Sequence, residues 1–262
     1  MKNFVQMVQN EYIMTEKEIE HFIVEAGNMA IDYLDQNNLN GIVLGLSGGL
    51  DSTVSAYIIR KAIERRKSDK KLLGINICIG NSEEHLRYAD EVGKITCDAY
   101  LQFDEFKDSF KSFNESVSKS SDVIKAAGLE VLNDPVSMGN LKARLRMMIL
   151  YDIAKKSNCI VLGSDNRSET QNGFFTMHGD GACDMNLLYD IYKGLQLWQI
   201  AKALDMNLDY MMFGEISETE REWQQKDALT LIHIIEKAPA SQRNYAIRLL
   251  KLFIAATGTS ST

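Results

Sequence analysis

Residues 41–55 decide the fold, and they read Gly-Ile-Val-Leu-Gly-Leu-Ser-Gly-Gly-Leu-Asp-Ser-Thr-Val-Ser. An apolar run, Ile42 to Leu46, precedes two glycines, and apolar residues recur at helical spacing after Asp51. We therefore predict a buried strand, a tight turn and a helix. The glycines lack the Cβ atoms that keep a backbone away from a ligand, and Ser52 can cap the helix. Because helix N-termini attract anions, the ligand that suits this turn is a phosphate chain.

Asp51 is an acid inside a turn that suits phosphate. Its carboxylate would repel such a ligand unless a cation lay between them, so the sequence implies a magnesium ion. Two other phosphate-binding patterns are absent from the turn, the Walker A loop and the Gly-x-Gly-x-x-Gly dinucleotide fingerprint. An ordinary strand–turn–helix, with glycines needed only for the turn, stays open as the alternative.

The bulk composition is that of a globular protein with one large α/β domain or two small ones. The 262 residues are 45% hydrophobic and 25% charged. The net charge of −7 argues against non-specific binding to nucleic acid or an anionic membrane, so local basic residues must meet any anionic substrate. No apolar run reaches the about 18 residues of a membrane span, and the N-terminus lacks a signal-peptide core. We expect a cytoplasmic protein with neither membrane nor nucleic acid as partner.

The cysteines and histidines do not suggest a metal site. None of the four cysteines forms a Cys-x-x-Cys pair, and the four histidines are isolated from one another. Cys78 and Cys159 lie in apolar runs and are expected to be buried thiols.

Strands and helices alternate along the chain. Expected strands lie at about residues 42–46, 72–79, 100–103 and 159–163, and expected helices at about 15–37, 50–66, 82–96, 104 onward and 137–157. Phe106, Phe110 and Phe113 recur at helical spacing as core aromatics, and 116–121 is expected to be a loop or weak helix. The alternation favours the α/β class, with a doubly wound parallel sheet of the Rossmann type flanked by helices.

The carboxyl ends of the expected strands carry the polar turns. The turn at 47–52, Gly80-Asn81 and Gly163-Ser164 all fall there, where ligands bind in such sheets. No linker divides the chain, so we expect one domain over 1–262, with a helical C-terminal region at about 208–262. The sequence therefore predicts a nucleotide site at this edge of the sheet.

Four motifs together resemble a known family. The Ser-Gly-Gly-x-Asp-Ser turn, Ser47–Ser52, resembles the pyrophosphate loop of the N-type ATP pyrophosphatases. Three further stretches follow it: Gly-Asn-Leu-Lys-Ala-Arg-Leu-Arg-Met at 139–147, Val-Leu-Gly-Ser-Asp-Asn-Arg-Ser-Glu at 161–169, and Gly-Phe-Phe-Thr-Met-His-Gly-Asp-Gly-Ala-Cys-Asp at 173–184. In this order and spacing they resemble ammonia-dependent NAD synthetase, from about Ile19 to Leu204.

The resemblance implies a role for each motif residue and an adenine-nucleotide α-hydrolase-like fold. ATP would be wrapped by Gly45, Leu46, Ser47, Gly48, Gly49, Leu50, Asp51 and Ser52. Asp51 and Glu169 would hold Mg²⁺, Ser164 and Lys193 would contact ATP, and Arg144 and Asp184 would contact deamido-NAD. Asp51 and Lys193 are the residues assigned to catalysis.

The implied reaction is amide formation in two steps. A substrate carboxylate attacks the α-phosphate of ATP, which gives an acyl-adenylate and pyrophosphate, and ammonia then displaces AMP. Only about 40 residues precede the loop, so no glutaminase domain is expected there, and ammonia would be free or supplied by a partner. The family is homodimeric, and the apolar residues on several faces of the helix at 137–157 suit a second subunit.

Each assignment has a structural alternative. Arg144 and its basic neighbours could form a solvated helix face. Glu169 could cap a helix together with Ser168, and Asp180 and Asp184 could form turns in a glycine-rich loop.

The chain departs from the family on the substrate side. Met177 stands where the family has a lysine, and Asn186-Leu187-Leu188 occupies the region where the family has a proline. The family's Pro-Ser/Thr-Ala-Asp-Leu and Gln-x-Asp-Glu segments are matched only by the altered stretches 213–218 and 224–227, and a C-terminal His-Lys pair is missing. Three hypotheses follow: an NAD synthetase with a diverged tail, a related amide ligase acting on nicotinate mononucleotide or a natural-product acid, and a non-catalytic nucleotide-binding homologue. Retention of both Asp51 and Glu169 argues against the third.

Overall fold

A computed structural model describes residues 14–103, 106–131, 135–192, 195–204 and 206. The chain divides into two units, Met1–Met212 and Phe213–Thr262, and the second lies entirely outside the described residues. The expected helical region at about 208–262 therefore cannot be compared with the structure, and a single domain over 1–262 stays a prediction.

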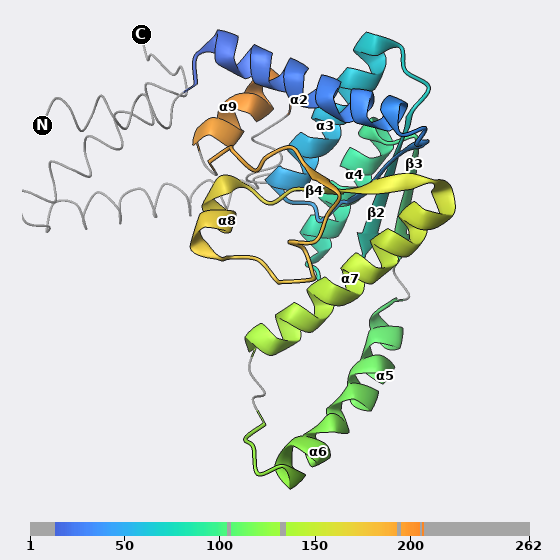
Figure 1. The fold of residues 1–262 in the computed structure, drawn as a ribbon, viewed down its shortest axis with the longest axis vertical. Helices are drawn as coiled ribbons and strands as arrows, with labels where there is room; N and C mark the ends of the chain where they lie inside the picture. Colours follow the sequence, from blue (N-terminus) through green and yellow to red (C-terminus); the bar gives the residue numbers. More distant parts are fainter. Residues whose placement is uncertain (1–13, 104–105, 132–134, 193–194, 205, 207–262) are drawn as a thin grey trace, which may run out of the picture. The chain divides into compact units, whose positions relative to one another are not determined.

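The first unit is built on a five-stranded parallel sheet with the strand order β3-β2-β1-β4-β5 (Figure 1). The strands are β1 (Gly41–Gly45), β2 (Lys71–Ile77), β3 (Ala99–Phe103), β4 (Cys159–Gly163) and β5 (Met185–Asn186). The prediction of a doubly wound α/β fold is confirmed. The sequence did not predict β5, because two residues are too few to show a period.

Eight described helices connect the strands (Figure 1). They are α2 (Glu16–Gln36), α3 (Leu50–Arg66), α4 (Glu83–Thr96), α5 (Phe106–Ser118), α6 (Ser120–Ala126), α7 (Pro135–Ser157), α8 (Arg167–Asn172) and α9 (Leu195–Ala203). The Thr15 side chain and Glu18 form the predicted capping box at the start of α2. None of these described helices is long and apolar enough to cross a membrane.

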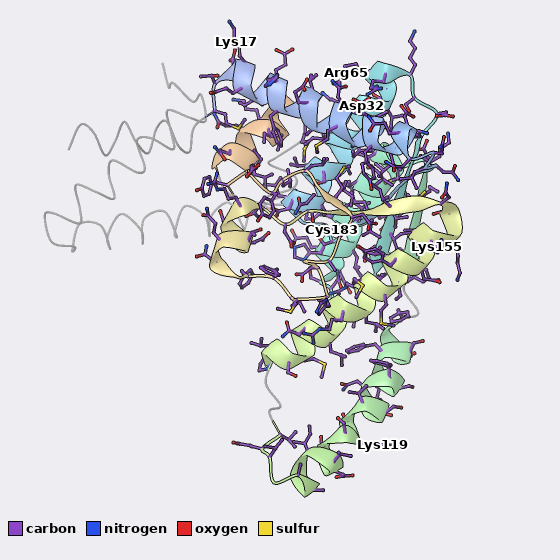
Figure 2. All side chains as sticks on the ribbon, in the orientation of Figure 1. Lys17, Asp32, Arg65, Lys119, Lys155 and Cys183 are labelled. Atoms are coloured by element: carbon purple, nitrogen blue, oxygen red, sulfur yellow. The ribbon has the colours of Figure 1, made fainter. Side chains whose placement is uncertain are left out.

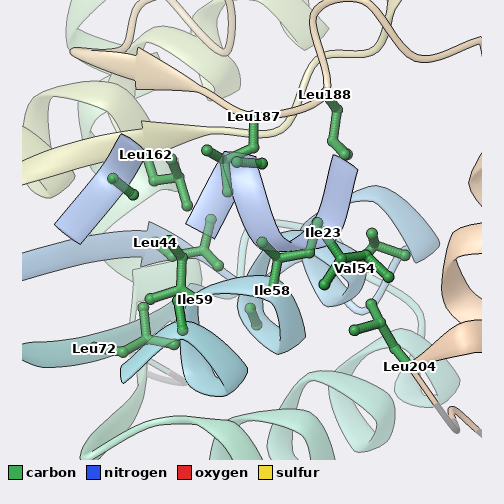
Figure 3. Packing of buried hydrophobic residues seen from close by; sticks show 14 of the residues in the cluster. Ile23, Leu44, Val54, Ile58, Ile59, Leu72, Leu162, Leu187, Leu188 and Leu204 are labelled. Carbon is green, nitrogen blue, oxygen red and sulfur yellow. The ribbon is translucent and has the colours of Figure 1, made fainter. Parts of the chain in front are cut away.

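Alternate residues of β1 enter two different cores. Ile42 and Leu44 pack in a cluster with residues of α2, α3 and α9, and Figure 3 shows Leu44 among them. Val43 packs in a second cluster with residues of α5 and α7. A strand buried on both faces needs a continuous apolar sequence, which is why 42–46 shows no polar alternation.

One sequence expectation about the helices is wrong, and a second, which left two possibilities open, is narrowed. Phe113 was expected in the core but is 40% exposed, whereas Phe110 is buried. Of the loop or weak helix expected at 116–121, the structure shows helix, because α5 ends at Ser118 and α6 begins at Ser120. The hydroxyls of Ser116 and Ser118 donate to backbone carbonyls one turn earlier. Cys78 is buried as expected, whereas Cys159 is only partly buried.

The order of the strands fixes where a ligand can bind. The chain runs from β1 outward to β3, then returns through α5, α6 and α7 to place β4 on the other side of β1. Leu44 of β1 pairs with Leu162 of β4, so the carboxyl ends of these strands lie side by side. Connections leave them toward opposite faces of the sheet, and such a switch point opens a crevice for ligands.

Candidate active site

A cavity of about 450 Å³ opens at the carboxyl ends of β1, β2 and β4, as the sequence predicted. Eight of the predicted site residues line it: Gly45, Leu46, Ser47, Gly49, Asp51, Ser52, Ser164 and Glu169. They come from segments more than a hundred residues apart, and the adjacent positions of β1 and β4 bring them together.

The turn after β1 leaves a helix N-terminus uncapped. Gly48 has φ +80°, and a Cβ there would collide with the carbonyl oxygen of His85, so only glycine fits. Helix α3 begins at Leu50 with Gly49 as N-cap, and no side chain caps it. The amides at this N-terminus are therefore suited to an anionic ligand.

The predicted cap by Ser52 is wrong, because the helix begins two residues before it. The Ser52 hydroxyl instead donates to the Gly49 carbonyl at 3.1 Å and lies 3.1 Å from the Ser47 hydroxyl. Ser47 Oγ in turn accepts from the Gly49 amide at 3.2 Å. These bonds hold the turn in one shape before any ligand arrives.

In the turn after β4, a side chain of the protein caps the N-terminus of helix α8. Asn166, fully buried, caps α8, because its Oδ1 accepts from the Glu169 amide and Glu169 Oε2 accepts from the Asn166 amide. The expected alternative for Glu169 is thus half right: it forms a capping box, but with Asn166 and not with Ser168. Glu169 still lines the cavity.

Asn166 also connects the two predicted metal ligands. Its Nδ2 donates to Asp51 Oδ1 at 2.7 Å, while its backbone amide donates to Glu169. We gave Asn166 no role from the sequence. The signal that could have found it is the Asn-x-x-Glu spacing after a buried strand, which is that of a capping box.

Four carboxylates line one side of the cavity: Asp51, Asp165, Glu169 and Asp180. Burial, together with the negative charges of Asp180, Glu169 and Asp51, raises the pKa of Asp165 to about 6. The other three acids therefore repel an ionised Asp165, and a divalent cation beside them would reduce that repulsion.

The donor set fits magnesium. Among the residues that the structure describes, no three histidine, cysteine or acidic side chains converge on a metal position. Mg²⁺ is commonly held by one or two carboxylates together with phosphate oxygens and water, so Asp51 and Glu169 suffice when a polyphosphate is bound.

The side of the cavity formed by β2 carries donors. Asn76 is 1% exposed, and its Nδ2 has no hydrogen-bond partner within the described part of the chain. Arg146 of α7 also lines the cavity. Neither was predicted. Asn76 could have been noticed as the polar residue within the apolar run 72–79, since a buried amide needs a partner.

Two predicted residues, Arg144 and Asp184, are not among the residues that line the cavity. Arg144 is exposed and donates from Nε to the Met177 carbonyl at 3.2 Å. Asp184 accepts from the Val161 amide at 2.8 Å and from the Tyr151 hydroxyl. Burial, and then the Asp184 charge, raise the pKa of Tyr151 to about 12. Contacts of Arg144 and Asp184 with a dinucleotide stay predictions.

The structure does not place the three other predicted residues, Gly48, Leu50 and Lys193, in the lining of the cavity. Gly48 and Leu50 belong to the first turn but are not among the residues that line the cavity. Lys193, predicted to be catalytic, lies outside the described residues.

A doubly wound sheet with an uncapped phosphate loop beside paired carboxylates defines a nucleotide-binding α/β protein. The family model for NAD synthase matches residues 22–211. The chain belongs to the NAD synthase family, as the sequence motifs suggested.

Individual relatives extend this result. The chain is 34% identical over 178 residues to the NH3-dependent NAD(+) synthetase of Mycoplasma genitalium. The aligned region covers 66% of this chain and 65% of that protein, so the chain spans just under two thirds of that relative's length. It is 30% identical over 244 residues to the corresponding synthetase of Methanocaldococcus jannaschii, covering 83% and 86%. Among solved structures, NMN synthetase from Francisella tularensis has a TM-score of 0.60 and 26% identity, covering 74% of this chain and 73% of that one.

Proposed function

We propose that this protein is an ATP-dependent amide-forming ligase, an ammonia-dependent NAD synthetase. It would convert deamido-NAD, ATP and ammonia to NAD, AMP and pyrophosphate through an acyl-adenylate. The observation that carries the proposal is the pairing of an uncapped helix N-terminus with Asp51 and Glu169 at adjacent strand ends. Such a site can hold the pyrophosphate of ATP and leave the α-phosphate open to attack.

The described residues divide the work of the first step. The amides at the start of α3 and the Ser47 hydroxyl bind the β- and γ-phosphates. Asp51 and Glu169 would hold Mg²⁺, and the charge of the ion would stabilise the departing pyrophosphate. Asn166 keeps Asp51 and Glu169 close together. The protein acts mainly by positioning and charge stabilisation, with Lys193 proposed as a further ATP contact.

Nicotinate mononucleotide is the second candidate for the acceptor. The residue that motivates this candidate is Met177, which is 65% exposed and replaces the family's lysine. A thioether accepts only weak hydrogen bonds and carries no charge, so it contributes less than lysine to holding the second phosphate of a dinucleotide.

Pyrophosphate release with ATP, Mg²⁺ and ammonium separates the candidates. Deamido-NAD, nicotinate mononucleotide and unrelated carboxylic acids would be compared at equal concentration. The proposal requires turnover with deamido-NAD. Turnover with the mononucleotide alone would replace it with the second candidate, and ATP binding without release by any acid would favour a non-catalytic homologue.

The assembly and the compartment also belong to the proposal. Helix α7 leaves Val136 69% and Met148 56% exposed, and such large apolar side chains are suited to the interface of a homodimer. Light scattering at working concentration would test it, and a monomer would contradict it. The cytoplasm stays the predicted compartment.

A further inference from the structure

Arg146 of α7 occupies a different environment from its neighbour Arg144. Two residues along a helix turn the side chain by about 200°, so the two arginines point in nearly opposite directions. Arg144 is exposed, whereas Arg146 reaches the cavity side and is partly buried. Burial lowers the pKa of Arg146, although the group stays charged at neutral pH.

The Arg146 guanidinium binds the connection that follows β2. Its Nε donates to the Ile77 carbonyl at 3.2 Å, and its Nη2 donates to the Ile79 carbonyl at 3.4 Å and to Asn81 Oδ1 at 2.9 Å. All three acceptors are neutral and belong to residues 77–81. The arginine therefore joins α7 to the carboxyl end of β2 and to the turn beyond it.

The same connection supports the phosphate loop. Ser82 caps α4 by accepting from the His85 amide, and Gly48 is packed against the His85 carbonyl so tightly that no Cβ fits. Residues 78–85 therefore form the support on which the turn of Gly48 and Gly49 rests. If this support moved, the amides that face the ligand would move with it.

We propose that Arg146 is a positioning residue for the phosphate loop. It acts through residues 77–85, whose place it fixes by three hydrogen bonds, and not by carrying charge to the substrate. This inference rests on the proposed ATP-dependent function. It assigns to the second arginine of the 139–147 motif a task distinct from that expected of Arg144.

Two substitutions separate shape from charge. Arg146→Gln removes the charge and most of the donors, whereas Arg146→Lys keeps the charge but cannot reach three acceptors at once. We expect both variants to lose about 100-fold in kcat/KM for ATP, the order of loss caused by a 1 Å misplacement. The KM for the acceptor should change little. Lys155→Gln is the matched control, because Lys155 is exposed at the C-terminal end of the same helix (Figure 2).

A double-mutant cycle tests the route through the turn. Asn81→Ala removes one acceptor of Arg146. It should lower kcat/KM for ATP, but by less than Arg146→Gln does. Combined with Arg146→Gln it should add almost nothing, because both changes release the same connection. Additive losses would overturn the proposal, as would full activity in Arg146→Lys or wild-type behaviour of both Arg146 variants.

Binding measurements keep the result independent of the reaction. Calorimetry with magnesium pyrophosphate compares the phosphate loop of each variant with that of the wild type, and thermal unfolding shows that each variant is folded. If Arg146→Gln does not fold, Arg146→Lys and Asn81→Ala decide the outcome. Wild-type protein that binds pyrophosphate but releases none from ATP would refute the proposed function alone. Equal pyrophosphate affinity in folded variants would refute the positioning role alone.

Discussion

The two turns that face each other across the switch point differ in how they use a helix N-terminus. The turn after β1 ends in glycine and leaves the start of α3 without a capping side chain. The turn after β4 ends in Asn166, and its capping box occupies the start of α8. The first turn thus offers donors to an anion, and the second offers the Glu169 carboxylate to a cation. Neighbouring strands supply opposite halves of one site.

The Asp51 carboxylate should give the largest effect when changed. Asp51→Asn is isosteric and can still accept from Asn166, so it removes charge without removing the bond. We expect kcat/KM for ATP to fall about 100-fold or more, because the metal loses a charged ligand. Pyrophosphate release over a range of Mg²⁺ concentrations measures it.

Asp32→Asn is the matched control for that prediction. Asp32 lies on α2 and pairs with Arg66, away from the cavity residues (Figure 2). Activity near the wild type in Asp51→Asn would remove the carboxylate from the mechanism.

The glycine turn should respond next. Gly48→Ala forces a side chain into the left-handed region and against the His85 carbonyl, so we expect a loss of about 2 kcal/mol in the free energy of unfolding. Gly139→Ala is the matched control: a Cβ there meets nothing within 4 Å, and alanine in helix α7 should stabilise by about 0.5–1 kcal/mol. Urea denaturation compares the two, and equal stabilities would contradict the rigid-turn description.

The Asn166 cap should have a smaller effect on stability but a separate one on activity. Asn166→Ala should lower the free energy of unfolding by about 1 kcal/mol, as the loss of an N-cap usually does. Thr15→Ala is the matched control. It removes the N-cap of α2, far along the chain from the site, and should lower the free energy of unfolding by a similar amount. Only Asn166→Ala should also lower ATP kcat/KM, because only Asn166 joins Asp51 to Glu169. Equal kcat/KM for ATP in Asn166→Ala and Thr15→Ala would show that Asn166 acts only as a helix cap.

Asp165 should give the smallest effect, visible as a pH dependence. Its pKa is raised from 3.8 to about 6 in the folded protein, so between these values the native state holds a proton that the unfolded chain releases. Stability therefore falls as the pH rises through this window. Below this pH window, Asp165→Asn and the wild type should have the same free energy of unfolding. Above the window, the free energy of unfolding of Asp165→Asn should be higher by about 1 kcal/mol, after allowance for solvent screening. Chemical denaturation at pH values on either side of the window measures this, and a constant difference would contradict it.

Much of this protein could be predicted from local patterns. The apolar runs at 42–46 and 159–163, and the glycines between strand and helix, predicted β1, β4 and the phosphate turn because these signals lie within a few residues of one another. The capping box at Thr15 was equally local. The family resemblance assigned Asp51 and Glu169 to one magnesium site, and the shared edge at which parallel strands end agrees with that assignment.

Only the tertiary structure decided the contacts that join distant segments. The packing of α7, β2 and β4 brings Asn166 to Asp51 and places Arg146, rather than Arg144, among the residues that line the cavity. It also leaves Asn76 Nδ2 at the cavity with no hydrogen-bond partner among the residues that the structure describes. Those arrangements follow from the burial of two cores on either side of the sheet, and no short stretch encodes them. The sequence by itself therefore determined the fold class and the phosphate loop, while packing decided which side chains complete the site.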